Sequence, residues 1–292
     1  LCCIGDLVED VVVWPEITPR RGTDTPSRVF RHRGGSAANV AVLAATAGGR
    51  SRFVGQVGDD RLGELLVEDL VVAGVEPVVV RAGRTGTIVV LIEADGERTM
   101  LPDRAAATQL SEIPPHTLDD VTWLHVPGYS LMVEPLGGTS RALIAVARSR
   151  DIKISIDASS VSVIEEYGIS AFTGDLERLE PDVLFCNEEE AHLLDIGPGA
   201  SPPSVQLAVV KAGPDPVCLV DVHTATWVPV PRVDAVADTT GAGDAFAAGF
   251  IIATMGGAKP VQATRAGNSL AAQLLRHPGA DVRNRQPVPE ER

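Results

Sequence analysis

The stretch DTTGAGDAFAAGFIIA, residues 238–253, places small residues and two carboxylates at the start of an apolar segment with helical character. Gly241, Ala242 and Gly243 carry little or no side chain, so their backbone N–H groups can point at an anion. A helix that starts near Gly243 would add the positive end of its dipole. The stretch therefore predicts an anion-binding loop beyond the carboxyl end of a strand. A tight turn with an Asp cap explains the same residues. A Walker A loop is excluded because Gly-Lys-Ser/Thr is absent, and Phe246 occupies the third glycine position of GxGxxG.

Strand and helix patterns alternate along much of the chain. Apolar strand patterns at VTWLHV (121–126), IKISID (152–157) and DVLFCN (182–187) each precede a helical pattern, near 134–149, near 160–167 and at EEEAHLL. This alternation predicts an α/β fold with a mostly parallel sheet covered by helices on both faces. Near the N-terminus, Ser36 is expected to cap a helix over 34–49, and an Asp is expected to cap one over 59–74.

A hairpin pattern over 85–101, with Asp95-Gly96 as its turn signal, interrupts the alternation. The hairpin and the strand over 8–14 predict a small antiparallel outgrowth beside the main sheet. We therefore expect a single domain over 1–292, with a lid formed by approximately 8–32 and 85–103. The strands of such a lid would offer an unpaired edge to a second copy of the chain, and so favour a homodimer.

The composition of the chain limits the classes of partner that it can bind. The 292 residues are 45% hydrophobic and 22% charged, with a formal net charge of −14, which would repel an extended phosphate backbone and argues against nucleic acid. No stretch approaches 18 uncharged apolar residues and no basic leader precedes the first strand, so no membrane partner is expected. The four cysteines form no CxxC motif and are expected to be free thiols in a reducing cytoplasm. The histidines show no zinc-binding spacing.

Four motifs together resemble one enzyme family. DTTGAGDAF (238–246) is similar to the C-terminal signature of the ribokinase-like (PfkB) carbohydrate kinases. GGSAANVA (34–41) and VGDDRLGELL (57–66) resemble the family's N-terminal signature, and NEEEA (187–191) matches its Asn-x-x-Glu element. The match runs in the family's order from Gly5 to about Gly279. It implies a ribokinase-like fold that transfers the γ-phosphoryl group of ATP to a sugar-type hydroxyl.

The resemblance assigns Asp244 as the catalytic base and the amides of Gly241, Ala242 and Gly243 as the anion hole. Phosphoryl transfer depends on positioning and charge neutralisation, which these groups can supply. We expect Asp244 to be ionised at neutral pH, because an ordinary Asp has a pKa of about 3.9 and the helix start favours its charge.

The same resemblance assigns two groups of metal-binding residues. Asn187 and Glu190 would organise Mg²⁺, through water. An acidic, solvated helix start is the alternative for this segment. Asp238 and Thr240 would help to hold a monovalent cation such as K⁺, and turn formation explains both equally well.

For the acceptor, the resemblance assigns Asp10, Gly34, Gly35 and Asn39, and we add Arg104 because of its position after the hairpin. Asp10 would accept hydrogen bonds from sugar hydroxyls, the two glycines would let the backbone approach the ring, and Asn39 would reach it from the following helix. The alternatives are an exposed strand residue, a bend and a core-facing amide. Arg104 follows the hairpin, and either pairs with an acidic substrate or phosphate or lies at the rim of the pocket.

For the nucleotide, the resemblance assigns Asn187, Lys211, Gly213, Asn268 and Gly279. Lys211 and Gly213 belong to VVKAGPDP (209–216), whose two prolines depart from the family's glycine-rich loop. Asn268 and Gly279 belong to the helix and turn beside adenine, although a helix-surface amide would also explain Asn268.

The sequence favours a neutral acceptor of the ribose or fructose type, because Arg104 is the one evident cation for an acid and aromatic residues make up only 4% of the chain. A 2-keto-3-deoxy sugar acid and a nucleoside remain alternatives. A non-catalytic sugar- or nucleotide-binding regulator on the same scaffold is a different class, as is a dehydrogenase, which the missing GxGxxG disfavours.

Overall fold

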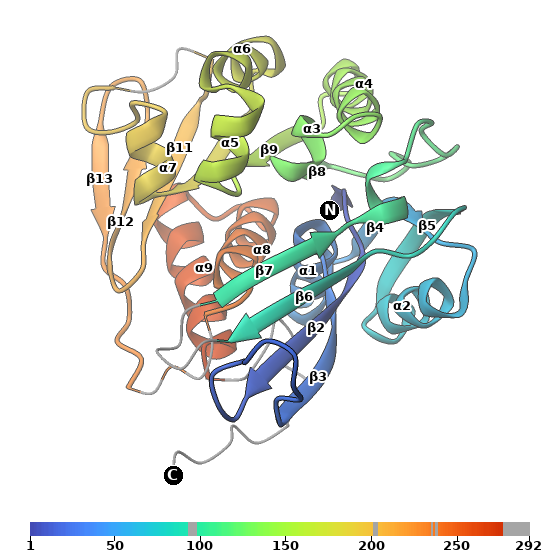
Figure 1. Cartoon of the computed structure of the whole chain (residues 1–292). Coiled ribbons are helices and arrows are strands. Elements are labelled where there is room, and N and C mark those ends of the chain that lie inside the picture. Colours follow the sequence, from blue (N-terminus) through green and yellow to red (C-terminus); the bar gives the residue numbers. More distant parts are fainter. Residues whose placement is uncertain (93–97, 201–203, 235, 237–238, 277–292) are drawn as a thin grey trace.

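The main body of the chain is built on one mixed sheet. The computed structural model describes residues 1–92, 98–200, 204–234, 236 and 239–276. Within these residues the main sheet has nine strands in the order β13-β12-β11-β10-β9-β8-β1-β4-β5 (Figure 1). Their bounds, in that order, are Ala225–Val228, Asp215–Val220, Leu207–Ala212, Val183–Asn187, Lys153–Asp157, Trp123–Pro127, Cys2–Ile4, Ser51–Val57 and Val75–Arg81.

The seven strands from β11 to β5 are parallel, whereas β12 and β13 pair antiparallel at one edge. The central strands are buried on both faces, as expected of a parallel sheet, and β10 reads VLFCN with its first four residues buried. In the register of β10 and β11, Asn187 lies opposite Lys211 at the carboxyl ends. The sheet thus brings these two side chains to the same edge.

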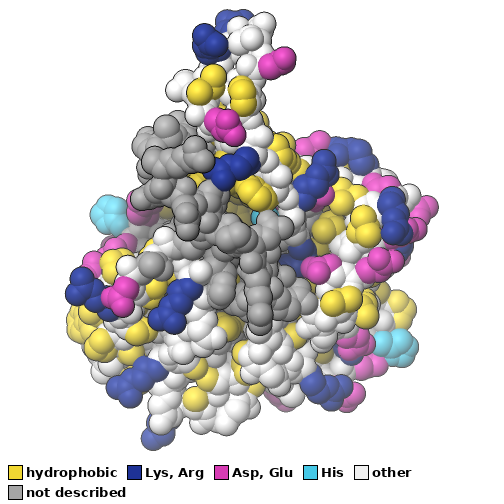
Figure 2. All heavy atoms as spheres, turned by 90° about the horizontal axis from the view of Figure 1, so that it is seen from below, with side chains coloured by type: hydrophobic (Ala, Val, Ile, Leu, Met, Phe, Trp, Pro, Cys, Tyr) yellow, Lys and Arg dark blue, Asp and Glu magenta, His cyan; other side chains and the backbone are white. Residues whose placement is uncertain are grey.

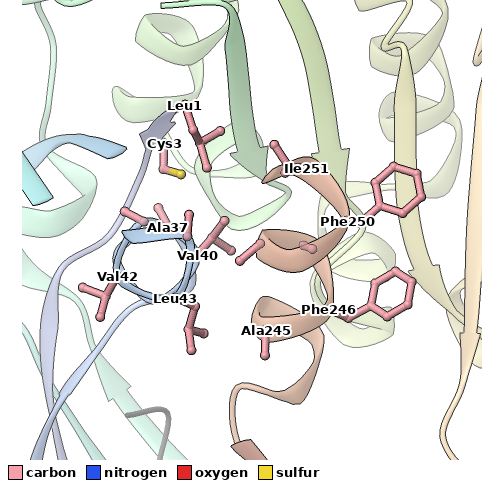
Figure 3. Close-up of a cluster of buried hydrophobic side chains, with 14 of the residues drawn as sticks. Leu1, Cys3, Ala37, Val40, Val42, Leu43, Ala245, Phe246, Phe250 and Ile251 are labelled. Carbon is pink, nitrogen blue, oxygen red and sulfur yellow. The ribbon is translucent and has the colours of Figure 1, made fainter. Parts of the chain in front are cut away.

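Helices cover both faces of this sheet, as the sequence predicts. The helices are α1 (Ser36–Thr46), α2 (Arg61–Val72), α3 (Tyr129–Met132), α4 (Leu136–Ser149), α5 (Val161–Tyr167), α6 (Ile169–Leu179), α7 (Glu188–Leu193), α8 (Ala242–Met255) and α9 (Pro260–Leu274). One hydrophobic core lies under α1, α2, α8 and α9, and a second lies under α4 to α7. Figure 3 shows the first core, where Val40 and Leu43 of α1 lie beside α8. Phe246 and Phe250 project from the other side of α8.

A second sheet of four strands lies beside the main body, in the order β3-β2-β6-β7. Its strands are β2 (Val8–Pro15), β3 (Ser27–Gly34), β6 (Thr87–Ile92) and β7 (Arg98–Asp103), drawn blue and green in Figure 1. The central pair, β2 and β6, is parallel, and both outer strands pair antiparallel. The segments predicted to form a lid therefore combine into one small sheet. The predicted turn at Asp95-Gly96 lies outside the described residues.

Two local predictions were wrong. Ser36 does not cap α1: the N-cap is Gly35, with φ at 101°, and Ser36 is the first helical residue. The sequence pattern also predicts a loop over KAGPDP (211–216) after a strand at 205–210, but Lys211 and Ala212 belong to β11, and Asp215 already begins the antiparallel strand β12. By contrast, Asp60 does cap α2, where its side chain accepts a hydrogen bond from the Gly63 N–H at 2.8 Å.

Charges of both signs are interspersed on the face of the molecule seen in Figure 2. Among the described residues, no helix has the length and apolar character needed to cross a bilayer. All four cysteines are free thiols; Cys2, Cys3 and Cys186 are buried and Cys218 is partly exposed.

Candidate functional site

Three neighbouring parallel strands carry polar side chains at their carboxyl ends. These side chains are Asp157, the last residue of β9, Asn187, the last residue of β10, and Lys211, one residue before the end of β11. Lys211 Nζ lies 2.8 Å from Asp157 Oδ2 in a largely buried ion pair. Burial alone would lower the pKa of Lys211, but the ion pair and hydrogen bond with Asp157 raise it above its usual value. The ammonium group is therefore held charged at this edge.

The start of α8 lies against this lysine. A Cβ on Gly243 would stand 3.3 Å from Lys211 Nζ. Gly241 is the N-cap of α8 and has φ at 75°, a left-handed conformation that glycine adopts without a steric cost. The Ala242 N–H donates to the Thr239 carbonyl at 3.2 Å, so this amide takes part in the turn. The first-turn N–H groups of a helix have no intrahelical acceptor. The α8 N-terminus thus lies beside the ammonium group of Lys211, which is paired with Asp157.

Asp244, in the first turn of α8, is held by two side chains of α1. Ser36 Oγ donates to Asp244 Oδ1 at 2.7 Å, and Asn39 Nδ2 donates to Asp244 Oδ2 at 2.9 Å. Burial raises the pKa of Asp244 to about 7, although both hydrogen bonds act to lower it. The expectation of an ordinary pKa was wrong, because removal of the carboxylate from water outweighs the helix start.

Asp10 lies on the small sheet and faces the same region. Burial, together with the neighbouring Asp6 carboxylate, raises the pKa of Asp10 to about 7. Its Oδ1 atom is buried and has no hydrogen-bond partner among the described residues. A Cβ on Gly34 would collide with this carboxylate, and one on Gly35 would collide with the backbone carbonyl of Asp6. The two glycines therefore make room for the acidic segment of β2 and its preceding loop.

Arg104 is already paired. Its Nη1 forms an ion pair with Asp6 Oδ2, and its guanidinium carbon lies 4.5 Å from the centre of the Tyr129 ring. Asp6 is 3% exposed, and its other oxygen, Oδ1, has no hydrogen-bond partner in the described part of the chain. Asp10 of β2 and Asp6 of the preceding loop thus each present a carboxylate oxygen that can accept a hydrogen bond.

Asn187 and Glu190 form a capping box at the start of α7. Asn187 Oδ1 accepts from the Glu190 N–H at 2.8 Å, while the Glu190 carboxylate accepts from the N–H of Asn187 at 2.8 Å and from its Nδ2 at 3.0 Å. Glu190 is buried, and this burial, together with the charge of Asp157, raises its pKa to about 7. Glu188 and Glu189 are exposed, so a solvated acidic helix start describes these two residues and not Glu190.

The residues predicted to bind the nucleotide lie farther apart in the fold than the residues around Asp244. Asn268 lies on α9, donates to the Pro229 carbonyl at 3.3 Å and lines a hollow of about 630 Å³ between α9 and residues 229–231. Gly213 lies in the exposed turn between β11 and β12. Asp238 and Gly279 lie outside the described residues, so their predicted roles carry no structural description.

Thr240 contacts the small sheet. The guanidinium of Arg98, the first residue of β7, donates to the hydroxyl of Thr240 and, at 2.6 Å, to that of Thr239. These two threonines immediately precede the α8 N-cap. The small sheet therefore touches the loop that was predicted to bind an anion.

Sequence reasoning overlooked four residues that the fold brings to the site: Asp6, Ser36, Arg98 and Asp157. Of these four, Asp157 was the residue that the sequence could most readily have revealed, because it ends a predicted strand in the same way as Asn187. No sequence signal links Ser36 to Asp244, which lies 208 residues away.

The family model for pfkB family carbohydrate kinases matches residues 1–286, and the chain belongs to this family. It is an ATP-dependent carbohydrate kinase, a phosphotransferase with an alcohol group as acceptor. Among curated relatives, a fructokinase of Klebsiella pneumoniae is 31% identical over 268 residues, which cover 85% of this chain and 82% of the relative. An ATP-dependent ribose-1-phosphate kinase of Halopiger xanaduensis is 32% identical over 262 residues with the same coverage.

Solved structures confirm the predicted ribokinase-like fold. Adenosine kinase from Sinorhizobium meliloti superposes with a TM-score of 0.83 at 22% identity, over 96% of this chain and 94% of that one. A fructokinase from Xylella fastidiosa with bound ATP gives a TM-score of 0.81 at 23% identity, over 96% of this chain and 93% of that one.

Proposed function

We propose that this kinase phosphorylates a neutral sugar of the ribose or fructose type, with Asp244 as the general base. The single observation that carries the role of Asp244 is its position: it lies in the first turn of α8, next to Lys211 and the helix N-terminus, with both oxygens held by α1. A pKa of about 7 suits a general base that works near neutral pH.

In the proposed reaction, the acceptor hydroxyl oxygen forms a bond to the γ-phosphorus as the bond from that phosphorus to the β–γ bridging oxygen breaks. The hydroxyl proton passes to Asp244, and ADP leaves with the electron pair of the broken bond. The amides of Gly241, Ala242 and Gly243 and the ammonium of Lys211 stabilise the charge on the transferred group. Release of the Ala242 amide from its turn would accompany phosphate binding in this scheme.

The residues around Asn187 fit Mg²⁺ held largely through water and phosphate. Among the described residues, no group of three or more His, Cys, Asp or Glu side chains is arranged to hold a metal ion. Asp157 nevertheless lies close enough to Glu190 for its charge to raise the pKa of Glu190. Mg²⁺ favours one or two carboxylates plus waters and substrate phosphates, and it neutralises phosphate charge.

We also propose that Asp238 and Thr240 help to hold a K⁺ ion. Replacement of K⁺ by a bulky organic cation at constant ionic strength should slow turnover.

Charge at the small sheet supports a neutral acceptor. Asp6 neutralises Arg104, so this arginine is not available to an acidic sugar or a sugar phosphate without loss of a buried ion pair. The unpartnered oxygens of Asp6 and Asp10 would accept hydrogen bonds from sugar hydroxyls, and would repel a carboxylate. A panel of neutral sugars, sugar acids, sugar phosphates and nucleosides, assayed for ADP release, tests this choice. A clear preference for an acid or a phosphorylated sugar would overturn it.

Asp244→Asn tests the base. The substitution keeps the shape and one hydrogen-bond acceptor but removes the basicity, so we expect kcat to fall by about 10²–10⁴-fold with ATP binding retained. The measurements are steady-state turnover on the best sugar and calorimetric titration with ATP. A kcat within a few-fold of wild type would exclude Asp244 as the base, and joint loss of folding and ATP binding would identify it as a structural link between α1 and α8.

We further propose that the small sheet acts as a lid and pairs with a second copy of the chain. Its outer strands β3 and β7 have free edges among the described residues, and Val29, Met100 and Leu101 are more than half exposed. Sedimentation velocity at micromolar concentration tests the dimer, and a monomer would exclude it.

Four free thiols and the use of ATP support a cytoplasmic location, which cell fractionation checks.

A further inference from the structure

A buried arginine links three elements beside the proposed base. Arg33 is the last residue but one of β3 and is 8% exposed. Its Nε atom donates to Asp69 Oδ2 on α2 at 3.0 Å, and its Nη1 atom donates to Asn39 Oδ1 on α1 at 2.7 Å. Arg33 therefore reaches both α2 and the side chain that holds Asp244.

The contact with Arg33 determines which way the Asn39 amide faces. A guanidinium has only donors, so the Asn39 oxygen must face Arg33, and the Asn39 nitrogen must then face Asp244 Oδ2, at 2.9 Å. A flipped amide would place its oxygen against the carboxylate, acceptor against acceptor, and its nitrogen against the guanidinium. Both contacts would be lost at once.

We propose that Arg33 is a positioning residue that locks the Asn39 amide in the orientation that hydrogen-bonds the Asp244 carboxylate. This inference rests on the proposed function, in which Asp244 accepts the proton. Arg33 does not touch the reacting atoms; it acts through Asn39. A hydrogen bond to an ionised carboxylate favours the ionised form, so loss of the lock raises the pKa of Asp244 and misaligns it.

Other groups also act on Asp244. The ionisable or charged groups that face it from neighbouring elements are Asp157 on β9, Lys211 on β11, Asp10 on β2 and Cys3 on β1. Arg33 also lowers the pKa of Asp10 through its charge. A pH profile of one Arg33 variant would mix these effects, so a double-mutant cycle with Asn39 is needed to isolate the route through the amide.

The cycle compares wild type, Arg33→Gln, Asn39→Ala and the double variant. We expect each single variant to lower kcat by about tenfold. Each should also raise the apparent pKa on the acidic side (the acidic limb) of the kcat/KM pH profile by about one unit. The double variant should be no worse than Asn39→Ala alone, because Arg33 has nothing left to orient. Fully additive losses in kcat would overturn the inference.

Two further variants separate positioning from structural support. Asp69→Asn removes the ion pair of Arg33 with α2 but leaves its contact with Asn39, so it should lower the melting temperature without moving the acidic limb. Arg31→Gln is the matched control on the same strand, because Arg31 is exposed and pairs with Glu9 at 2.9 Å, whereas Arg33 contacts Asn39. It should keep kcat within twofold. If Asp69→Asn shifted the apparent pKa of the acidic limb as far as Arg33→Gln does, Arg33 would only anchor α2.

Thermal unfolding accompanies every variant. If Arg33→Gln does not fold, Arg33→Lys takes its place in the cycle, because it keeps the charge but cannot donate to Asp69 and Asn39 in the same fork geometry. The variant Asp244→Asn distinguishes failure of the proposed function from failure of the positioning role of Arg33. If it retains wild-type kcat, the proposed function fails; if it is inactive and the Arg33 cycle is additive, only the positioning role fails.

Discussion

At the scale of single residues, the ionisation of Asp244 is set by opposing effects. Burial raises its pKa to about 7, while the hydrogen bonds from Ser36 and Asn39 lower it. Each bond to an ionised group is worth roughly 1.5–3 kcal/mol, and one pKa unit corresponds to about 1.4 kcal/mol. Because the pKa lies near neutral pH, a change in one donor should shift the pH range in which the enzyme works.

Ser36→Ala should therefore raise the apparent pKa on the acidic side of the kcat/KM profile by about one unit. The ionised form of Asp244 loses a donor, so a higher pH is needed to populate it, and the rate should approach that of wild type above the shifted pKa. A pH profile from 5 to 9 measures this. A loss of rate that is equal at every pH would show that Ser36 aligns the base without changing its ionisation.

At the scale of elements, α7 connects helix capping with the proposed metal site. Glu190 uses both carboxylate oxygens in the capping box with Asn187, yet it is buried near Asp157 with a pKa of about 7. A buried carboxylate that titrates near neutral pH costs stability when it is ionised, unless a cation lies nearby. The capping box orients the carboxylate, and its charge remains available to attract Mg²⁺.

Glu190→Gln should raise the Mg²⁺ concentration needed for half-maximal rate while the KM for sugar stays nearly unchanged. In wild type this Mg²⁺ requirement should also increase as the pH falls through about 7, because Glu190 becomes neutral, and the variant should lack that dependence. Titrations with Mg²⁺ at pH 6 and pH 8 measure both effects. Glu188→Gln is the matched control, since Glu188 is exposed on the same helix start. Identical Mg²⁺ curves for both variants would remove Glu190 from the site.

At the scale of the whole molecule, the small sheet and the α8 loop meet through Arg98. Its guanidinium donates to the hydroxyls of Thr239 and Thr240, 141 and 142 residues along the chain. The contact is exposed, so it contributes little to stability. It nevertheless places a permanent positive charge, with paired donors, next to the proposed path of the phosphates.

Arg98→Gln should consequently lower kcat/KM for ATP by about tenfold while the melting temperature stays within a few degrees of wild type. Steady-state kinetics with ATP varied at saturating sugar, together with thermal unfolding, give the two readouts. Arg28→Gln is the control, because Arg28 is an exposed arginine on the opposite outer strand of the small sheet. Equal kinetics for the two variants would leave Arg98 as a surface contact only.

The sequence alone was enough to predict the mostly parallel sheet with helices on both faces, the family and Asp244 as the candidate base. These features depend on local patterns: apolar strands such as 182–187, and the Gly-Ala-Gly run that precedes Asp244. The tertiary structure alone decided that Ser36 and Asn39 hold Asp244, that Asp6 neutralises Arg104 and that Arg33 reaches Asn39.

The physical reason lies in sequence separation and desolvation. Ser36 and Asp244 are 208 residues apart, and their meeting depends on the packing of α1 against α8. The pKa of Asp244 depends on how much water that packing removes, which no local pattern encodes. The sequence therefore pointed to Asp244 as the candidate base, and the fold sets the pH range in which this carboxyl group is ionised.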